Sequence, residues 1–129
     1  MKKLLFLMLL LVSQSVMAEW TLINENNDTK FYVDFHSYQK VDKNKIKIWE
    51  LNDYPMGVNG IFSLKNLSEY DCKNKMRRTT YTITYSGNMG DGTSSSNDFN
   101  NGWLPVAPDT IGNQKLDDMC LMLKMKQTH

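Results

Sequence analysis

The chain has 129 residues, with 15 Lys and Arg residues against 14 Asp and Glu residues. This length suits one compact domain, and the balanced charge gives no reason to expect nucleic acid as the main partner. Two cysteines and two histidines could barely assemble a zinc site with four ligands. We therefore expect neither a metal site nor another cofactor.

The first eighteen residues have the pattern of a secretory signal peptide. Lys2 and Lys3 precede the apolar run 4–12, and the small-residue site Val16-Met17-Ala18 follows it. The run is shorter than the roughly 20 residues of a membrane-spanning helix, so no integral membrane anchor is expected after cleavage. Cleavage after Ala18 leaves one domain, residues 19–129, and Glu19 stands where a lipoprotein would carry cysteine. We expect an exported protein, periplasmic, secreted or at the cell surface.

Alternation of apolar and polar residues predicts β-strands through most of the domain, arranged as a meander of five to six strands. The strands are expected at residues 20–24, 30–35, 45–52, 61–65 and 78–85. The strand 61–65 can continue to Cys72, with Ser68, Tyr70 and Cys72 on one face. The apolar face of 45–52 switches at Trp49, which predicts a bulge there. Tyr81, Ile83 and Tyr85 are expected in the core, and Glu69 and Asp71 in water.

Glycine, serine and asparagine dominate residues 86–102, which predicts a long loop without a packed element. Asp109 or Thr110 can cap a following helix, in which four residues at helical spacing share one buried face: Leu116, Met119, Cys120 and Leu123. Methionines in this helix are better explained by core packing than by metal binding.

The two cysteines, Cys72 and Cys120, allow one intramolecular bridge, and the oxidising compartment that an exported protein reaches favours its formation. Cys72 falls on the same strand face as Tyr70, and Cys120 falls on the buried face of the helix. A bridge between them would tie the helix to the sheet, whereas a redox pair usually has the shorter C-x-x-C spacing. The predicted fold class is therefore α+β, with an antiparallel sheet and one C-terminal helix packed on it.

No group of residues predicts catalysis. Asp34, His36 and Ser37 resemble a nucleophilic triad in composition, but residues so close on one strand rarely form one. The glycines of 87–92 lack the Gly-Lys-Ser/Thr of a phosphate-binding loop, so they are interpreted as turn residues. Acid/base catalysis by the carboxylates is unsupported without being excluded, and we expect no enzyme.

The order of several short strings resembles the surface-adhesin protein E family, over residues 20–120. The strings are Phe31-Tyr32-Val33-Asp34, residues 49–54, Glu69-Tyr70-Asp71-Cys72, residues 85–92, and Trp103 with Pro105, Pro108, Ile111 and Gly112. The resemblance implies a curved antiparallel sheet, a C-terminal helix tied to it by the disulfide, and the capacity to dimerise. The founding member of the family is a lipid-anchored adhesin for host extracellular-matrix and serum proteins.

The resemblance implies a non-enzymatic binding protein whose partner is a host matrix or serum protein or an envelope protein. Loops on rigid sheets commonly carry recognition, so the candidate binding residues are Lys45, Lys47, Asn88, Met89, Asp91, Ser94 and Phe99. A loop without function is an equally good interpretation of 86–102. The alternative function is a periplasmic inhibitor or immunity-type protein that blocks an envelope enzyme.

Overall fold

The computed structural model describes residues 18–98 and 102–127, so Phe99 and most of the predicted signal peptide lie outside the described residues. The strands are β1 (Thr21–Glu25), β2 (Lys30–Asp42), β3 (Lys45–Val58), β4 (Ile61–Asp71), β5 (Met76–Tyr85), β6 (Ser94–Asp98) and β7 (Leu104–Pro105). A 3-10 turn, η1 (Asn88–Gly90), precedes β6, and the helix α2 spans Ile111–Gln127.

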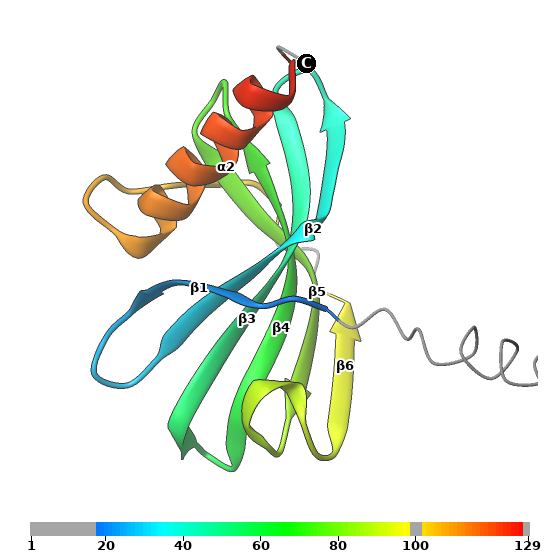
Figure 1. Ribbon diagram of the computed structural model, residues 1–129, viewed down its shortest axis with the longest axis vertical. Helices are drawn as coiled ribbons and strands as arrows, with labels where there is room; N and C mark the ends of the chain where they lie inside the picture. Colours follow the sequence, from blue (N-terminus) through cyan, green and yellow to red (C-terminus); the bar gives the residue numbers. More distant parts are fainter. Residues whose placement is uncertain (1–17, 99–101, 128–129) are drawn as a thin grey trace, which may run out of the picture.

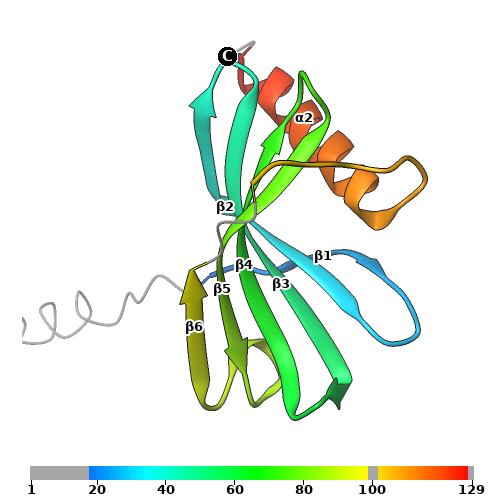
Figure 2. The same ribbon diagram turned by 180° about the vertical axis from the view of Figure 1, so that it is seen from behind.

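Each strand of the antiparallel sheet pairs with the next strand along the chain, in the order β1-β2-β3-β4-β5-β6. The short β7 pairs with the start of β5. Figure 2 shows residues 102–110 passing this part of β5 before the chain turns into α2. The predicted meander and its α+β class are confirmed.

The helix α2 packs across one end of the sheet (Figure 1). Its buried residues Leu116, Met119 and Leu123 meet a core from β2, β3 and β4 that includes Val33, Ile46, Ile48 and Tyr70. Thr110 caps the helix, because its Oγ1 accepts a hydrogen bond from the backbone N–H of Asn113 at 3.1 Å. The predicted disulfide joins Cys72 at the end of β4 to Cys120 in α2.

The predicted bulge near Trp49 is wrong for β3 and lies in its neighbour. β3 pairs with β4 without a break from Lys45 to Asp53. The register with β2 shifts instead between Asp34, which pairs with Trp49, and Gln39, which pairs with Lys47. The apolar face switches without a bulge because β3 is covered on different faces along its length, by α2 at one end and by η1 at the other.

Two predictions about which side chains face the core are wrong. Tyr81, Ile83 and Tyr85 are half-buried, and Thr82 between them is the buried residue. Thr82 pairs with Asn66, which pairs with the buried Glu50, so Thr82 lies on the face that α2 covers. Tyr81, Ile83 and Tyr85 alternate with Thr82 and Thr84 along β5, so their side chains line the opposite face of the sheet.

Glu69 and Asp71 are each 4% exposed and not in water as predicted. Arg78 reaches the Glu69 carboxylate at 2.8 Å. The Asp71 carboxylate accepts hydrogen bonds from the backbone N–H of Lys73 at 3.0 Å and from the Asn74 side chain at 2.9 Å. A carboxylate can be buried when a cation or hydrogen-bond donors compensate its charge. The alternation of apolar and polar residues does not reveal such partners.

The described residues 86–98 of the predicted loop 86–102 contain more regular structure than predicted, because η1 and β6 both lie within them. β6 pairs with β5 in regular register from Tyr85 with Ser94 to Tyr81 with Asp98. All five of its residues are exposed.

In the described part of the chain, no helix is long and apolar enough to cross a membrane.

Candidate binding surface

The turn formed by residues 87–92, called here the 87–92 turn, is fixed to β3 and β4 by hydrogen bonds. Asp53 Oδ1 accepts from the backbone N–H of Met89 at 2.8 Å and from Asn88 Nδ2 at 3.2 Å. Ser63 Oγ accepts from the Gly90 N–H at 2.9 Å and donates to the Gly87 carbonyl at 2.6 Å. Both anchors are buried, with Asp53 6% and Ser63 0% exposed, so the turn rests on a rigid base.

The sequence supplies the backbone conformations that this turn needs. Gly90 and Gly92 have φ angles of 78° and 84°, a region that favours glycine. Met89 adopts φ 54°, which is uncommon for a residue with a side chain. The interpretation of these glycines as turn residues is confirmed.

Four of the predicted binding residues come together at this end of the sheet. Asn88, Met89 and Asp91 are exposed residues of the 87–92 turn, and Ser94 opens the exposed strand β6. Met89 keeps 38% of its surface exposed while its backbone is held by Asp53. A held backbone with free side chains is suited to recognition, because little conformational entropy is lost on binding.

Lys45 and Lys47 lie elsewhere and are half-buried, not exposed as predicted. Lys45 pairs with Asp42 at 3.5 Å, and Lys47 lies 4.0 Å from Glu69. Lys47 is six residues from Asp53 along β3, about 20 Å for an extended strand. The two groups of predicted residues therefore cannot form one continuous small site.

The residues that resembled a triad engage in separate interactions. Ser37 Oγ donates to the backbone carbonyl of Asp34 at 2.6 Å and accepts from the Trp49 N–H at 2.9 Å. His36 Nε2 lies 2.9 Å from Glu19 Oε2, on exposed side chains. Ser37 stabilises the irregular part of β2, and no contact joins its hydroxyl to the imidazole.

A buried ionic cluster between sheet and helix is the feature that the sequence reasoning missed. Glu50 is fully buried, with Lys115 Nζ at 2.7 Å, Arg77 Nη2 at 3.5 Å and the Tyr70 hydroxyl donating to it at 2.6 Å. The available signal was the strand alternation, which places Glu50 on the same face as Ile46 and Ile48.

Burial raises the pKa of Glu50, but the charges of Lys115 and Arg77 and the hydrogen bonds from Lys115 and Tyr70 outweigh it. The pKa of Glu50 is thereby lowered to about 2. Burial and the neighbouring Glu50 carboxylate raise the pKa of Tyr70 well above its usual value. Glu50 is therefore ionised and Tyr70 protonated near neutral pH, and the cluster fixes α2 on the sheet.

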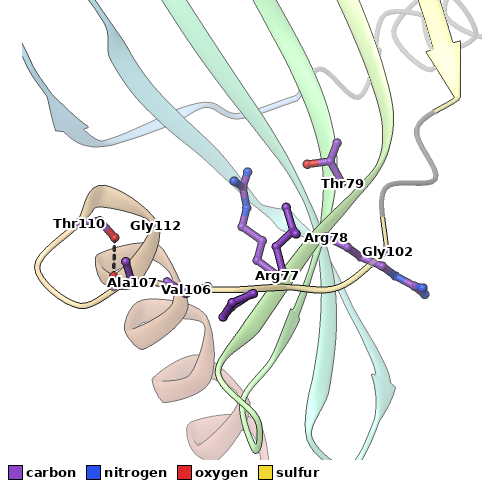
Figure 3. Close-up of a pocket in the computed structure, with 10 residues that line it drawn as sticks. Arg77, Arg78, Thr79, Gly102, Val106, Ala107, Thr110 and Gly112 are labelled. Carbon is purple, nitrogen blue, oxygen red and sulfur yellow. Dashed lines mark hydrogen bonds between the residues drawn. The ribbon is translucent and has the colours of Figure 1, made fainter.

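A hollow of about 270 Å³ lies between the start of β5, residues 102–107 and the beginning of α2 (Figure 3). Arg77 and Arg78 line it, but their guanidinium groups point to opposite sides of β5, toward Glu50 and Glu69. Thr110 Oγ1 donates to the Ala107 carbonyl at 2.7 Å beside it. The charged groups of this hollow are thus engaged by carboxylates of the sheet.

The face of the sheet opposite α2 carries a second, aromatic hollow of about 230 Å³. Trp20, Trp49 and Ile83 line it together with Asp34 and Lys65. The Lys65 ammonium already lies 5.6 Å from the centre of the Trp20 ring.

Within the described ranges, no group of three or more His, Cys, Asp or Glu residues could hold a metal ion.

The fold is similar to solved structures of protein E from Haemophilus influenzae. One structure aligns with a TM-score of 0.64 at 17% identity, covering 85% of this chain and 93% of that chain. Another aligns with a TM-score of 0.64 at 15% identity, covering 83% and 89%. No protein with curated annotation matches the sequence significantly.

Residues 20–121 match the family model described as surface-adhesin protein E. The match spans the sheet and the part of α2 up to Leu121, so it includes both disulfide cysteines. The residues that carried the resemblance therefore lie within one matched domain, and this chain belongs to the surface-adhesin protein E family.

Proposed function

We propose that this protein is an exported, non-enzymatic binding protein that contacts a host matrix or serum protein, or an envelope protein, through the 87–92 turn and the adjacent start of β6. Family membership supports adhesion as the general role. The observation that carries the choice of site is the backbone of the turn, held by Asp53 and Ser63 beneath exposed side chains.

The binding contribution of the turn is tested with a double substitution, Met89→Ala with Asp91→Asn. Neither side chain supplies the hydrogen bonds that anchor the turn, so the fold should persist. Binding is measured against a panel of immobilised matrix and serum proteins. For the partner that the unaltered protein binds, we expect the Kd of the double variant to be at least tenfold higher, because a few residues dominate the binding energy of an interface.

The matched control is Met125→Ala, which removes another exposed methionine side chain near the C-terminal end of α2. Its Kd should stay within twofold of the unaltered protein. Equal binding by the double variant would place recognition on another surface. Deleting residues 93–97 is a poorer test, because that deletion would remove most of β6.

Localisation distinguishes an adhesin from the alternative, a periplasmic inhibitor. Protease shaving and fractionation of cells that express the full chain should find the adhesin at the surface or in the medium. A pool protected in the periplasm would favour the inhibitor. Dimerisation remains a prediction, which light scattering of the purified protein can check.

A further inference from the structure

A basic hollow lies at the end of the sheet remote from the 87–92 turn. Its volume is about 350 Å³, and four of the residues that line it are lysines. Lys43 comes from the β2–β3 turn, Lys73 and Lys75 from the β4–β5 turn, and Lys124 from α2. Figure 1 shows both turns beside the C-terminal half of α2. Three segments distant in sequence thus bring ammonium groups around one space.

The floor of this basic hollow is buried and cross-linked. Leu116 and Leu123, which are 2% and 4% exposed, line it together with the Cys72–Cys120 disulfide. The bridge links the β4 end to the helix, so the lysine-bearing turn and Lys124 are held near each other. A ligand would meet a largely formed site, which lowers the entropy lost on binding.

Charge is concentrated here in a protein that is nearly neutral. Among the described residues that line it, four are lysines and one is a carboxylate, Asp117, which gives this lining a net charge of +3. The whole chain has a net charge of +1, so the residues outside this lining together carry −2. The nearby Asp71 carboxylate is buried and occupied by hydrogen bonds from Lys73 and Asn74. Local positive potential of this kind attracts anions.

The type of cation indicates the type of anion. The two arginines of the chain, Arg77 and Arg78, are engaged by Glu50 and Glu69. Arginine matches the geometry of carboxylates and phosphates alike, whereas lysine acts as a compact point charge that also binds phosphate. Because ammonium groups surround this hollow from several directions, a tetrahedral sulfate or phosphate ester can contact more of them with its three terminal oxygens than a planar carboxylate can with two.

We propose that the basic hollow binds an anionic sugar through its sulfate or phosphate esters. The hollow and the 87–92 turn lie at opposite ends of the sheet, so the two sites can be tested separately. This inference does not depend on which protein the turn contacts.

Binding is measured by calorimetry on the protein with its disulfide intact, in 50 mM NaCl. The probes are a heparin tetrasaccharide, a bis-phosphorylated glucosamine disaccharide and a short polyglutamate of equal charge. We expect binding of at least one sugar probe and at least tenfold weaker binding of polyglutamate. The sugar that binds identifies the source of the ester groups, sulfated matrix glycan or phosphorylated envelope glycan.

The double variant Lys73→Gln with Lys75→Gln should weaken sugar binding at least tenfold, and Lys43→Gln with Lys124→Gln should do the same. The control is Lys30→Gln with Lys65→Gln, which removes the same charge away from the basic hollow and should change the Kd less than twofold. Thermal melts confirm that each variant folds. Absence of sugar binding, equal loss in the control, or equal affinity for polyglutamate would overturn the proposal.

Discussion

Lys115 and Glu50 form an ion pair that is closed to water, with Lys115 4% and Glu50 0% exposed. Removing Lys115 takes away the nearest countercharge of the buried carboxylate, and breaking a buried ion pair in this way costs about 3–5 kcal/mol. We expect Lys115→Met to lower the free energy of unfolding by about that amount in urea denaturation. Adding Glu50→Leu should recover part of the loss, because the buried carboxylate is then removed as well and only the half-buried Arg77 is left without its partner. A double variant less stable than Lys115→Met alone would contradict this account.

The same carboxylate makes stability depend on pH. The pKa of Glu50 is about 2 in the folded protein, below its ordinary value of 4.5. The unfolded state therefore takes up a proton at higher pH, so the stabilisation is complete above about 4.5 and is lost as the pH falls toward 2. Urea midpoints between pH 6 and pH 2.5 should fall less steeply in Glu50→Leu with Lys115→Met. Equal slopes would assign the acid sensitivity to other groups, such as Asp71, whose pKa is also lowered.

Two glycines with similar backbone angles provide a matched comparison. Gly92 has φ 84° and Gly60 has φ 82°. A methyl group at Gly92 would collide with Ser86 Oγ, whereas none of the described atoms lies within 4 Å of a methyl group placed at Gly60. Gly60→Ala should cost about 1 kcal/mol from backbone strain. Gly92→Ala should cost more and should weaken partner binding, and equal unfolding midpoints would contradict the tight packing of the 87–92 turn.

At the level of secondary structure, the sequence predicts those elements whose buried residues recur at the spacing of a strand or a helix. β2, β4 and α2 follow from the spacing of residues such as Val33, Tyr70 and Leu116, which are all buried. β6 was missed because an exposed edge strand of serine and asparagine needs no apolar alternation. The burial of Glu50 and the convergence of Lys43 with Lys124 were missed for a related reason. Strand alternation places Glu50 on the same face as Ile46 and Ile48, but it does not show where α2 docks, and both features depend on that position.

The disulfide connects elements whose cysteines are 48 residues apart in sequence. Closing a loop of that length stabilises the folded state by roughly 4 kcal/mol in the chain-entropy model. Replacing both cysteines by serine should lower the free energy of unfolding by about this amount, measured by urea denaturation without reductant. The sheet should persist in circular dichroism, because its core includes Val33 and Ile46 from strands that the bridge does not touch. Complete loss of strand signal would show that the bridge is required for the fold itself.

For the whole molecule, the separation of its two candidate sites is the main functional point. The 87–92 turn and the basic hollow lie at opposite ends of the sheet (Figure 1). A partner protein and an anionic sugar should therefore bind together without competing. Adding a saturating sugar probe should leave the Kd for the protein partner within twofold, measured by biolayer interferometry. Strong competition would instead place both ligands on one surface.

The order β1-β2-β3-β4-β5-β6 has a consequence for how such a chain gains its structure. Every main strand finds its partner in the adjacent stretch of sequence, so the sheet can grow hairpin by hairpin with short loop closures. Topologies with low contact order fold faster than sheets built from distant strands. Docking of α2 onto β4 is then the long-range step, and oxidation of Cys72 and Cys120 makes that step permanent after the chain has left the reducing cytoplasm.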